Sequence, residues 1–464
     1  MAGLLSKERI VAGPGFNRWL VPPAALAIHL SIGQAYAFSV FKLPLTKVLG
    51  ITAPAAGDWK QTELAWIFTI AIVFLGLSAA VFGRWMEHVG PRKSGVVAAC
   101  CWSLGFFVSA VGIRTHNIWL LYLGYGVLGG CGLGIGYITP VSTLIKWFPD
   151  RRGMATGLAI MGFGGGAMIA SPLSQVLLDH YRTATSVGVA QSFITLGIIY
   201  LVAMLSGAFL CRIPAPGWRP AGWEPPALKD RGLITRHHVH VDRAIRTVPF
   251  YLLWTALFLN VTAGIGILEQ ASPMIQEMFK GMVKPSAAAG FVGLLSLFNM
   301  AGRFGWSSLS DRIGRKVTYG VFFTLGPLLY IALPYAGRLR SVELFVICAA
   351  LIISMYGGGF ATVPAYLSDL FGTQYVGAIH GRLLTAWSAA GVAGPVLVNY
   401  IREYQIEHGI PATQAYNVTM YLMAGLLVLG FFANLAVRPV PERFFMSDDE
   451  LARDRGLVGV PGRS

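Results

Sequence analysis

Charged residues are scarce in this 464-residue chain, where Asp, Glu, Lys and Arg together make up 12%. Soluble domains carry about 25% charged residues. A chain with so little charge, 55% apolar residues and a mean hydropathy of +0.61 is predicted to be a polytopic membrane protein. The net charge of +15 does not indicate nucleic-acid binding, because the basic residues lie in short segments between apolar runs.

Cysteine is also rare, and it lacks the spacing of a metal site or of a disulfide framework. The five cysteines lie in or beside apolar segments, at Cys100, Cys101, Cys131, Cys211 and Cys348. The group His237, His238 and His240 has no Cys or carboxylate pattern around it, so a solvated basic loop is favoured over a metal site. No nucleophile–base constellation appears either. The sequence therefore predicts no metal, no cofactor and no enzymatic activity.

Long apolar runs are what the chain does contain. With about 20 residues per crossing, twelve spans are predicted, at 19–41, 62–83, 94–113, 117–139, 153–178, 188–211, 248–271, 286–308, 317–336, 342–365, 376–401 and 415–437. An even number places both termini on one side. The connecting segments on that side are rich in Lys and Arg, so the positive-inside rule predicts an inner-membrane protein with both termini in the cytoplasm.

Two separated blocks of sequence recur at one offset. A shift of 224 residues lays Glu87 on Asp311 and Gly153 on Gly377. This duplication predicts an all-α fold of two six-helix bundles in the same orientation, related by an axis along the membrane normal, as in transporters. The expected domains are an N-terminal bundle over 1–211, a cytoplasmic linker over 212–247, and a C-terminal bundle with a cytoplasmic tail over 248–464.

One positive charge lies inside an apolar span. Placing Arg303 in hydrocarbon costs roughly 2.5–3.5 kcal/mol, so it is a candidate functional residue. Asn299, Arg303 and Ser307 recur four residues apart and share one helical face. We interpret this face as the wall of a cavity that receives an anion. Snorkelling of Arg303 to the interface, or a structural ion pair, is the alternative.

Two segments resemble the loop signature of the major facilitator superfamily, which combines glycine, an acid and basic residues. They are GRWMEHVGPRK at 83–93 and SDRIGRK at 310–316. Their carboxylates and cations can form a latch between helices that breaks as the two bundles rock. The resemblance implies a cytoplasmic gate made by Glu87, Arg92, Asp311 and Arg315.

Two further stretches resemble the oxalate/formate antiporter family and its monocarboxylate-transporter relatives. They are KWFPDRRG at 146–153 and SIGQAYAFSVFKLP at 31–44. These families place an Arg in helix eight, where Arg303 falls. The resemblance implies a carrier that works by alternating access.

The sequence departs from both groups in ways that bear on the substrate. Oxalate transporters of this family pair the helix-eight Arg with a Lys in helix eleven, and here that position is Trp387. The animal monocarboxylate relatives carry a Lys in helix one and an Asp one turn before the Arg, and here these are Val40 and Asn299. The resemblance therefore implies one uncompensated cation, suited to a single carboxylate that its planar fork binds through two hydrogen bonds.

The candidate substrate-binding residues beside Arg303 offer hydrogen bonds or narrow the pocket: Asn299, Tyr356, Gln34, Tyr36, Tyr137 and Trp387. Glu269, an acid within an apolar span, is the candidate proton-coupling group, with an exposed surface carboxylate as the alternative. His29 and His380 are weighed as proton carriers, but a hydrogen-bonded structural role is favoured for each.

The predicted function is secondary active transport of small monocarboxylates, such as lactate, pyruvate or formate, by proton symport or anion exchange. The protein is expected to act as a monomer in the lipid bilayer, with a small carboxylate anion as its partner and a proton as a candidate second one. Oxalate/formate exchange is an alternative. A carboxylate sensor built like a transporter is an alternative of another class.

Overall fold

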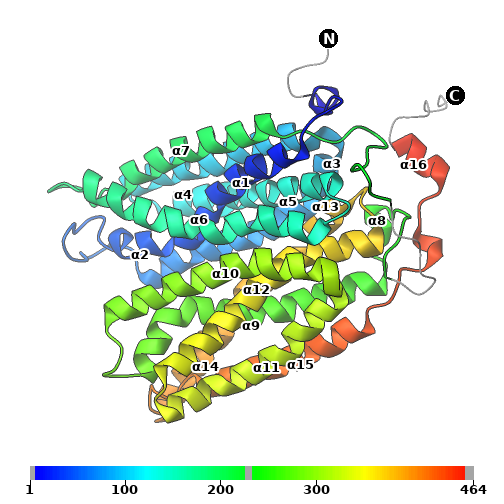
Figure 1. Cartoon of the computed structure of the whole chain (residues 1–464). Coiled ribbons are helices and arrows are strands. Elements are labelled where there is room, and N and C mark those ends of the chain that lie inside the picture. Colours follow the sequence, from blue (N-terminus) through cyan, green and yellow to red (C-terminus); the bar gives the residue numbers. More distant parts are fainter. Residues whose placement is uncertain (1–5, 225–232, 455–464) are drawn as a thin grey trace.

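The computed structural model describes residues 6–224 and 233–454, and within these ranges the chain is almost entirely helical (Figure 1). The main elements are α1 (Val21–Ile32), η3 (Gly33–Ala37), α2 (Ser39–Leu45), α3 (Gln61–Arg114), α4 (Ile118–Leu121), η4 (Tyr122–Gly129), α5 (Gly130–Trp147), α6 (Arg152–Tyr181), α7 (Val189–Leu210), α8 (Val241–Ala244), α9 (Val248–Met278), α10 (Pro285–Ile313), α11 (Arg315–Leu339), α12 (Val342–Phe371), α13 (Val376–Leu383), α14 (Thr385–Glu407), α15 (Asn417–Ala436) and α16 (Asp448–Asp454). The described residues form no β-strand.

These helices provide the twelve expected crossings. In the part of the chain that the structure describes, nine helical stretches are long and apolar enough to cross a membrane. One of them, within α3, contains two crossings, because Gly90 adopts φ 81° and breaks the helix just before Pro91. The remaining two are the broken helix α1–η3–α2 and α10.

The helices form two bundles that lie side by side. Figure 1 shows α1 to α7, in blue to green, above most of the helices α9 to α15, in green to orange, with α13 beside α5. The short helices α8 and α16 cover one end of both bundles. We call this end the terminal face. The breaks at Gly90 and Gly314, each with positive φ, lie there between successive crossings.

Two closely packed helix pairs join the bundles, and glycines make the close approach possible. Gly157 of α6 faces α10 so tightly that an added Cβ would lie 2.0 Å from Ser307 Oγ. Gly381 of α13 faces α3 in the same way, with a Cβ 2.1 Å from the carbonyl oxygen of Ala79. These glycines are 224 residues apart, so the duplication seen in the sequence recurs in the packing between the bundles.

Candidate binding site between the two bundles

Arg303 lies on α10 at the contact between the bundles and is fully buried. Its Nε donates a hydrogen bond to Asn299 Oδ1 at 2.9 Å, and Ser307 Oγ donates to its carbonyl oxygen. The predicted polar face of this helix is therefore confirmed. The two terminal nitrogens, Nη1 and Nη2, are buried and make no hydrogen bond of good geometry among the described residues, although the hydroxyls of Tyr36 and Tyr137 interact with the guanidinium. A guanidinium left in this state is ready to receive a bidentate acceptor.

Two phenyl rings hold the guanidinium from opposite bundles. Its central carbon lies 5.7 Å from the ring centre of Phe163 on α6 and 5.2 Å from that of Phe360 on α12. Such cation–π contacts are worth about 0.5–2 kcal/mol. They orient the charge and leave it uncompensated, because a neutral ring supplies no counter-ion.

Trp387 of α14 and Tyr137 of α5 continue this wall of rings. The ring centre of Trp387 lies 4.4 Å from Phe360, 5.4 Å from Phe163 and 5.5 Å from Tyr137. Trp387 Nε1 is buried without a hydrogen-bond partner in the described structure, and the buried Tyr137 hydroxyl interacts with Arg303 without donating a hydrogen bond of good geometry. Two more donors are therefore available next to the rings that hold Arg303, and each buried donor without an acceptor costs about 1–3 kcal/mol until a ligand satisfies it.

Tyr36 and Tyr356 close the same group of rings on another side. Tyr36 lies on η3 with its ring 5.0 Å from Phe163, and Tyr356 lies on α12 with its ring 5.2 Å from Phe360. Their hydroxyl oxygens are 3.4 Å apart across the bundle contact. We call the six rings around Arg303 the cage: Tyr36, Tyr137, Phe163, Tyr356, Phe360 and Trp387.

The structure thus brings together Arg303 and five of its predicted neighbours, which are Asn299, Tyr36, Tyr137, Tyr356 and Trp387. Gln34 lies elsewhere, because its Oε1 accepts a hydrogen bond from Tyr125 Oη at 2.9 Å inside the first bundle. The side chain of Glu269 lies outside the described residues. Sequence reasoning missed Phe163 and Phe360, which carry no polar atom. The spacing of four residues between Tyr356 and Phe360 is the signal that marks one of them.

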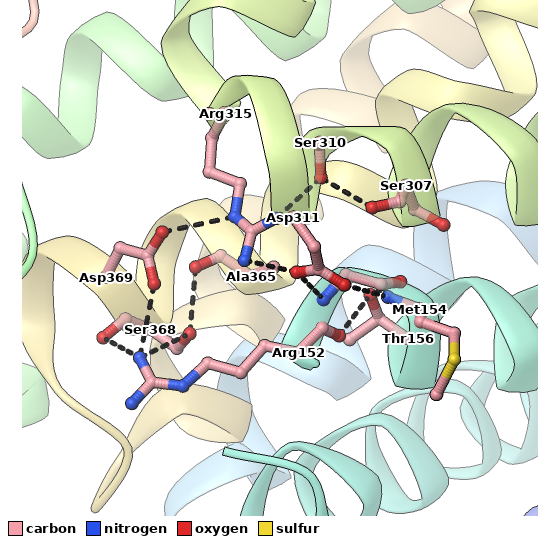
Figure 2. A network of polar contacts seen from close by, with 12 residues as sticks. Arg152, Met154, Thr156, Ser307, Ser310, Asp311, Arg315, Ala365, Ser368 and Asp369 are labelled. Carbon is pink, nitrogen blue, oxygen red and sulfur yellow. Dashed lines mark hydrogen bonds and ion pairs between the residues drawn. The ribbon is translucent and has the colours of Figure 1, made fainter. Parts of the chain in front are cut away.

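Asp311 closes the terminal face by capping a helix of the opposite bundle (Figure 2). Its two carboxylate oxygens accept hydrogen bonds from the backbone N–H groups of Gly153, at 2.9 Å, and Met154, at 2.8 Å. These amides belong to the first turn of α6, where they have no partner within the helix and the helix dipole favours a negative charge. Arg315 pairs with the same carboxylate at 2.7 Å.

Glu87, at the equivalent position of the first half, caps a helix of the second bundle. Its Oε1 accepts a hydrogen bond from the backbone N–H of Gly377, at 2.9 Å, in the first turn of α13. Ser142 donates to the same oxygen at 2.7 Å, and Lys146 pairs with Oε2. We call these two reciprocal helix caps, made by Asp311 and Glu87, the gate.

A third acid, Asp369 of α12, links the bundles beside this gate, as Figure 2 shows. Arg315 Nε lies 3.1 Å from one of its oxygens, and Arg152 Nη1, from the opposite bundle, lies 3.2 Å from the other. Sequence reasoning did not single out Asp369 or Arg152. The hydrogen bond that Arg92 donates, at 3.2 Å, runs to the carbonyl oxygen of Phe209 in its own bundle.

A cavity of about 1100 Å³ opens on the terminal face, between the gate and the chain that connects the bundles. The residues that line it include Glu87, Lys146, Arg152, Asp311 and Asp369. Arg303 is not among the described residues that line it. The gate therefore separates this cavity from the cage.

Asp242 of α8 adds a bridge at the outer edge of the terminal face. Its carboxylate lies 2.5 Å from Arg382 Nη2 of α13 and 3.6 Å from Arg84 Nη1 of α3, so it contacts both bundles. The hydrogen bond and the charge of Arg382 lower the pKa of Asp242 below its usual value. The acid is therefore ionised at neutral pH.

Comparison with known proteins supports the architecture. The chain is 27% identical to the oxalate:formate antiporter of Oxalobacter formigenes, over 82% of this chain and 83% of that protein. It is also 27% identical to monocarboxylate transporter 11 of Homo sapiens, over 91% of this chain and 83% of that protein.

Among solved structures, the E. coli fucose:proton symporter superposes with a TM-score of 0.62 at 15% identity, covering 89% of this chain and 99% of that one. At this identity the superposition supports the fold alone. The sequence model of the Major Facilitator Superfamily matches residues 16–395. The chain is therefore a multi-pass membrane transporter that belongs to the Major Facilitator Superfamily.

Proposed function

We propose that this transporter carries small monocarboxylates by alternating access, with the carboxylate bound to Arg303 in the cage. The observation that carries the proposal is the pair of buried nitrogens, Nη1 and Nη2, that make no hydrogen bond of good geometry among the described residues. Their planar arrangement matches the two oxygens of one carboxylate. Tyr137 Oη and Trp387 Nε1, which lie on the same wall and donate no hydrogen bond of good geometry there, are available to a further oxygen of the substrate.

The charge of the cage favours one carboxylate over two. Its six ring residues add no Lys or Arg to Arg303, and the residue at the helix-eleven position is Trp387. A second carboxylate would be buried in a low-dielectric site without a cation, which costs several kcal/mol. The names of the two curated relatives, one an oxalate:formate antiporter and one a monocarboxylate transporter, support the class of small organic anions.

We further propose that the terminal face is the cytoplasmic side of the inner membrane, because the segments there carry most of the connecting Lys and Arg residues. The proposed domain limits are 1–211 and 248–464 for the bundles and 212–247 for the cytoplasmic linker. In this orientation the closed gate describes a carrier shut toward the cytoplasm. Opening requires Asp311 to leave the first turn of α6 and Glu87 to leave that of α13. Proton symport or anion exchange then resets the empty carrier.

Exchange of oxalate for formate is the second candidate, and the 27% identity to the antiporter of Oxalobacter formigenes favours it. In this case Arg303 would hold one carboxylate of oxalate, and the other would depend on hydroxyl and indole donors in place of a second cation. Those donors are Tyr137 Oη and Trp387 Nε1.

Counterflow in proteoliposomes tests the two candidates directly. Vesicles are loaded with unlabelled L-lactate, pyruvate, formate or oxalate, and the uptake of the same labelled anion is followed at equal pH on both sides. Monocarboxylates are expected to drive uptake and oxalate is not. Faster counterflow with oxalate would favour the second candidate. Thermal stabilisation by the anions without any flux would replace both candidates with a carboxylate sensor.

A further inference from the structure

His29 of α1 is a fully buried imidazole with an unusual set of partners. Its Nδ1 lies 2.6 Å from the carbonyl oxygen of Ala159 on α6, and its Nε2 lies 3.0 Å from the carbonyl oxygen of Tyr137 on α5. A carbonyl oxygen only accepts hydrogen bonds, and a neutral imidazole has a single N–H. One of the two contacts is therefore a lone pair facing an oxygen unless the ring is doubly protonated. A structural role for a neutral His29 explains one contact and leaves the other repulsive.

The groups that face His29 from the neighbouring helices decide when it can accept that second proton. Arg303 of α10 and His380 of α13 act on it electrostatically. The ring of Tyr137 lies 5.3 Å from His29 and 5.8 Å from His380. Both nitrogens of His380 are buried without a hydrogen-bond partner in the described structure, so no acceptor stabilises a charge there. The hydrogen bonds of His29 run only to the two carbonyls within the described residues.

We propose that His29 is the binding site of a proton that moves together with the carboxylate held by Arg303. The proposal rests on the carboxylate transport proposed above and names its coupling ion and the site of that ion. It differs from the sequence prediction, which placed the candidate coupling group at Glu269. The step is a simple protonation: a hydronium ion on one side gives its proton to the unprotonated ring nitrogen and becomes water, and a water molecule on the other side takes the proton and becomes hydronium.

Charge balance explains why the two cargoes bind together. In the empty carrier Arg303 is charged and His29 is neutral, so the buried charge is one positive unit. A proton on His29 alone would place a second positive charge nearby in a low-dielectric interior, which is costly. A carboxylate on Arg303 cancels one charge, so the loaded site again carries one positive unit. By linkage, each cargo then raises the affinity for the other by the same factor.

The test uses the full chain in proteoliposomes, with labelled L-lactate as the probe. Two variants each keep one of the two contacts: His29→Gln can still donate to the Tyr137 carbonyl, and His29→Asn to that of Ala159. His380→Gln is the matched control, because it removes the other buried histidine. Each protein is assayed for counterflow at equal pH and for net accumulation driven by a pH gradient of one unit, with the membrane potential clamped.

With one proton per lactate, the wild type and His380→Gln are expected to accumulate lactate about tenfold over one pH unit. His29→Gln and His29→Asn are expected to retain counterflow and to accumulate none. Tenfold accumulation by either His29 variant, or loss of accumulation in His380→Gln alone, overturns the assignment. Absence of counterflow in the wild type with all of the tested monocarboxylates would instead overturn the proposed function.

A measurement on the wild type covers the case in which the His29 variants do not fold. Lactate binding to the purified protein is followed by calorimetry in two buffers of different ionisation enthalpy. The proposal predicts that about one proton is taken up for each lactate bound. Lactate binding without proton uptake overturns the proton site and leaves carboxylate binding intact.

Discussion

A single methyl group at Gly157 is expected to force the gate open. An added Cβ there would lie 2.0 Å from Ser307 Oγ and 2.7 Å from the carbonyl oxygen of Arg303. Real side chains do not approach so closely, so α6 and α10 must separate for Gly157→Ala to fit. Gly305 of α10 is the matched control, because a Cβ at that position meets nothing within 4 Å.

The comparison isolates the cost of the clash. Both substitutions replace a helical glycine by alanine and gain the same roughly 0.5–1 kcal/mol of helix stability. Overpacking a tight contact costs about 1–3 kcal/mol. Only Gly157→Ala bears this cost, because a Cβ at Gly305 meets nothing. It bears the cost only in the gate-closed state, where α6 and α10 are in contact. The ratio of gate-open to gate-closed protein should therefore rise by about 5- to 150-fold relative to Gly305→Ala.

A reporter cysteine measures this ratio. Ala378 of α13 is buried against α3 in the second closely packed helix pair, so Ala378→Cys, in a chain without its five native cysteines, reacts with a water-soluble maleimide only when the bundles part there. The labelling rate of the purified protein is expected to be 5- to 150-fold higher with Gly157→Ala than with Gly305→Ala. Equal rates in the two variants would refute the view that this packing holds the gate closed.

Two further predictions concern the terminal face. Asp311→Asn removes the charge from the cap on α6, a loss of about 1.5–3 kcal/mol for hydrogen bonds to a charged group, so the same reporter should label faster. Glu87→Gln should have a similar effect, and an unchanged rate in both would contradict the capping role. The pKa of Asp242 is lowered by its hydrogen bond with Arg382. Its ion pairs therefore stabilise the folded protein fully at pH values above the ordinary carboxyl pKa of about 3.9. This stabilisation is lost as the pH falls through the lower pKa of the folded state. The melting temperature of Asp242→Asn should lie below that of the wild type at pH 7, and the difference should shrink as the pH falls below about 3.9. A difference independent of pH would exclude the charge as its cause.

Local periodicity was enough to predict the polar face of α10, because a regular helix places Asn299, Arg303 and Ser307 in one row. The duplication in turn indicated that Glu87 and Asp311 have equivalent positions. It did not indicate their partners, because helix N-termini offer backbone amides that leave no mark in the side-chain pattern. Such caps can be predicted only when it is known which helix N-terminus lies next to which carboxylate in the folded protein.

The partners of Gln34 and Arg92, and the position of Phe163, also have local causes. Gln34 and Tyr36 lie two residues apart on the helical turn η3, and side chains at this spacing do not share a helical face, so they point to different surroundings. Arg92 follows the break at Gly90, which redirects the second crossing of α3 so that this side chain reaches α7. Phe163 was not predicted, because it lies in a glycine-rich segment whose sequence indicates only close helix packing. Its role depends on the position of Arg303, which belongs to the other bundle.

Counterflow of labelled L-lactate by variants of Arg303 tests the central claim most directly. Arg303→Ala removes both terminal nitrogens, and Arg303→Lys keeps the charge but loses the planar fork. The exposed Arg338 at the end of α11 provides the control Arg338→Ala. With melting temperatures confirming that each protein is folded, we expect no counterflow above empty liposomes for Arg303→Ala, a reduced rate for Arg303→Lys and the wild-type rate for Arg338→Ala. Wild-type counterflow by a folded Arg303→Ala protein would contradict the account.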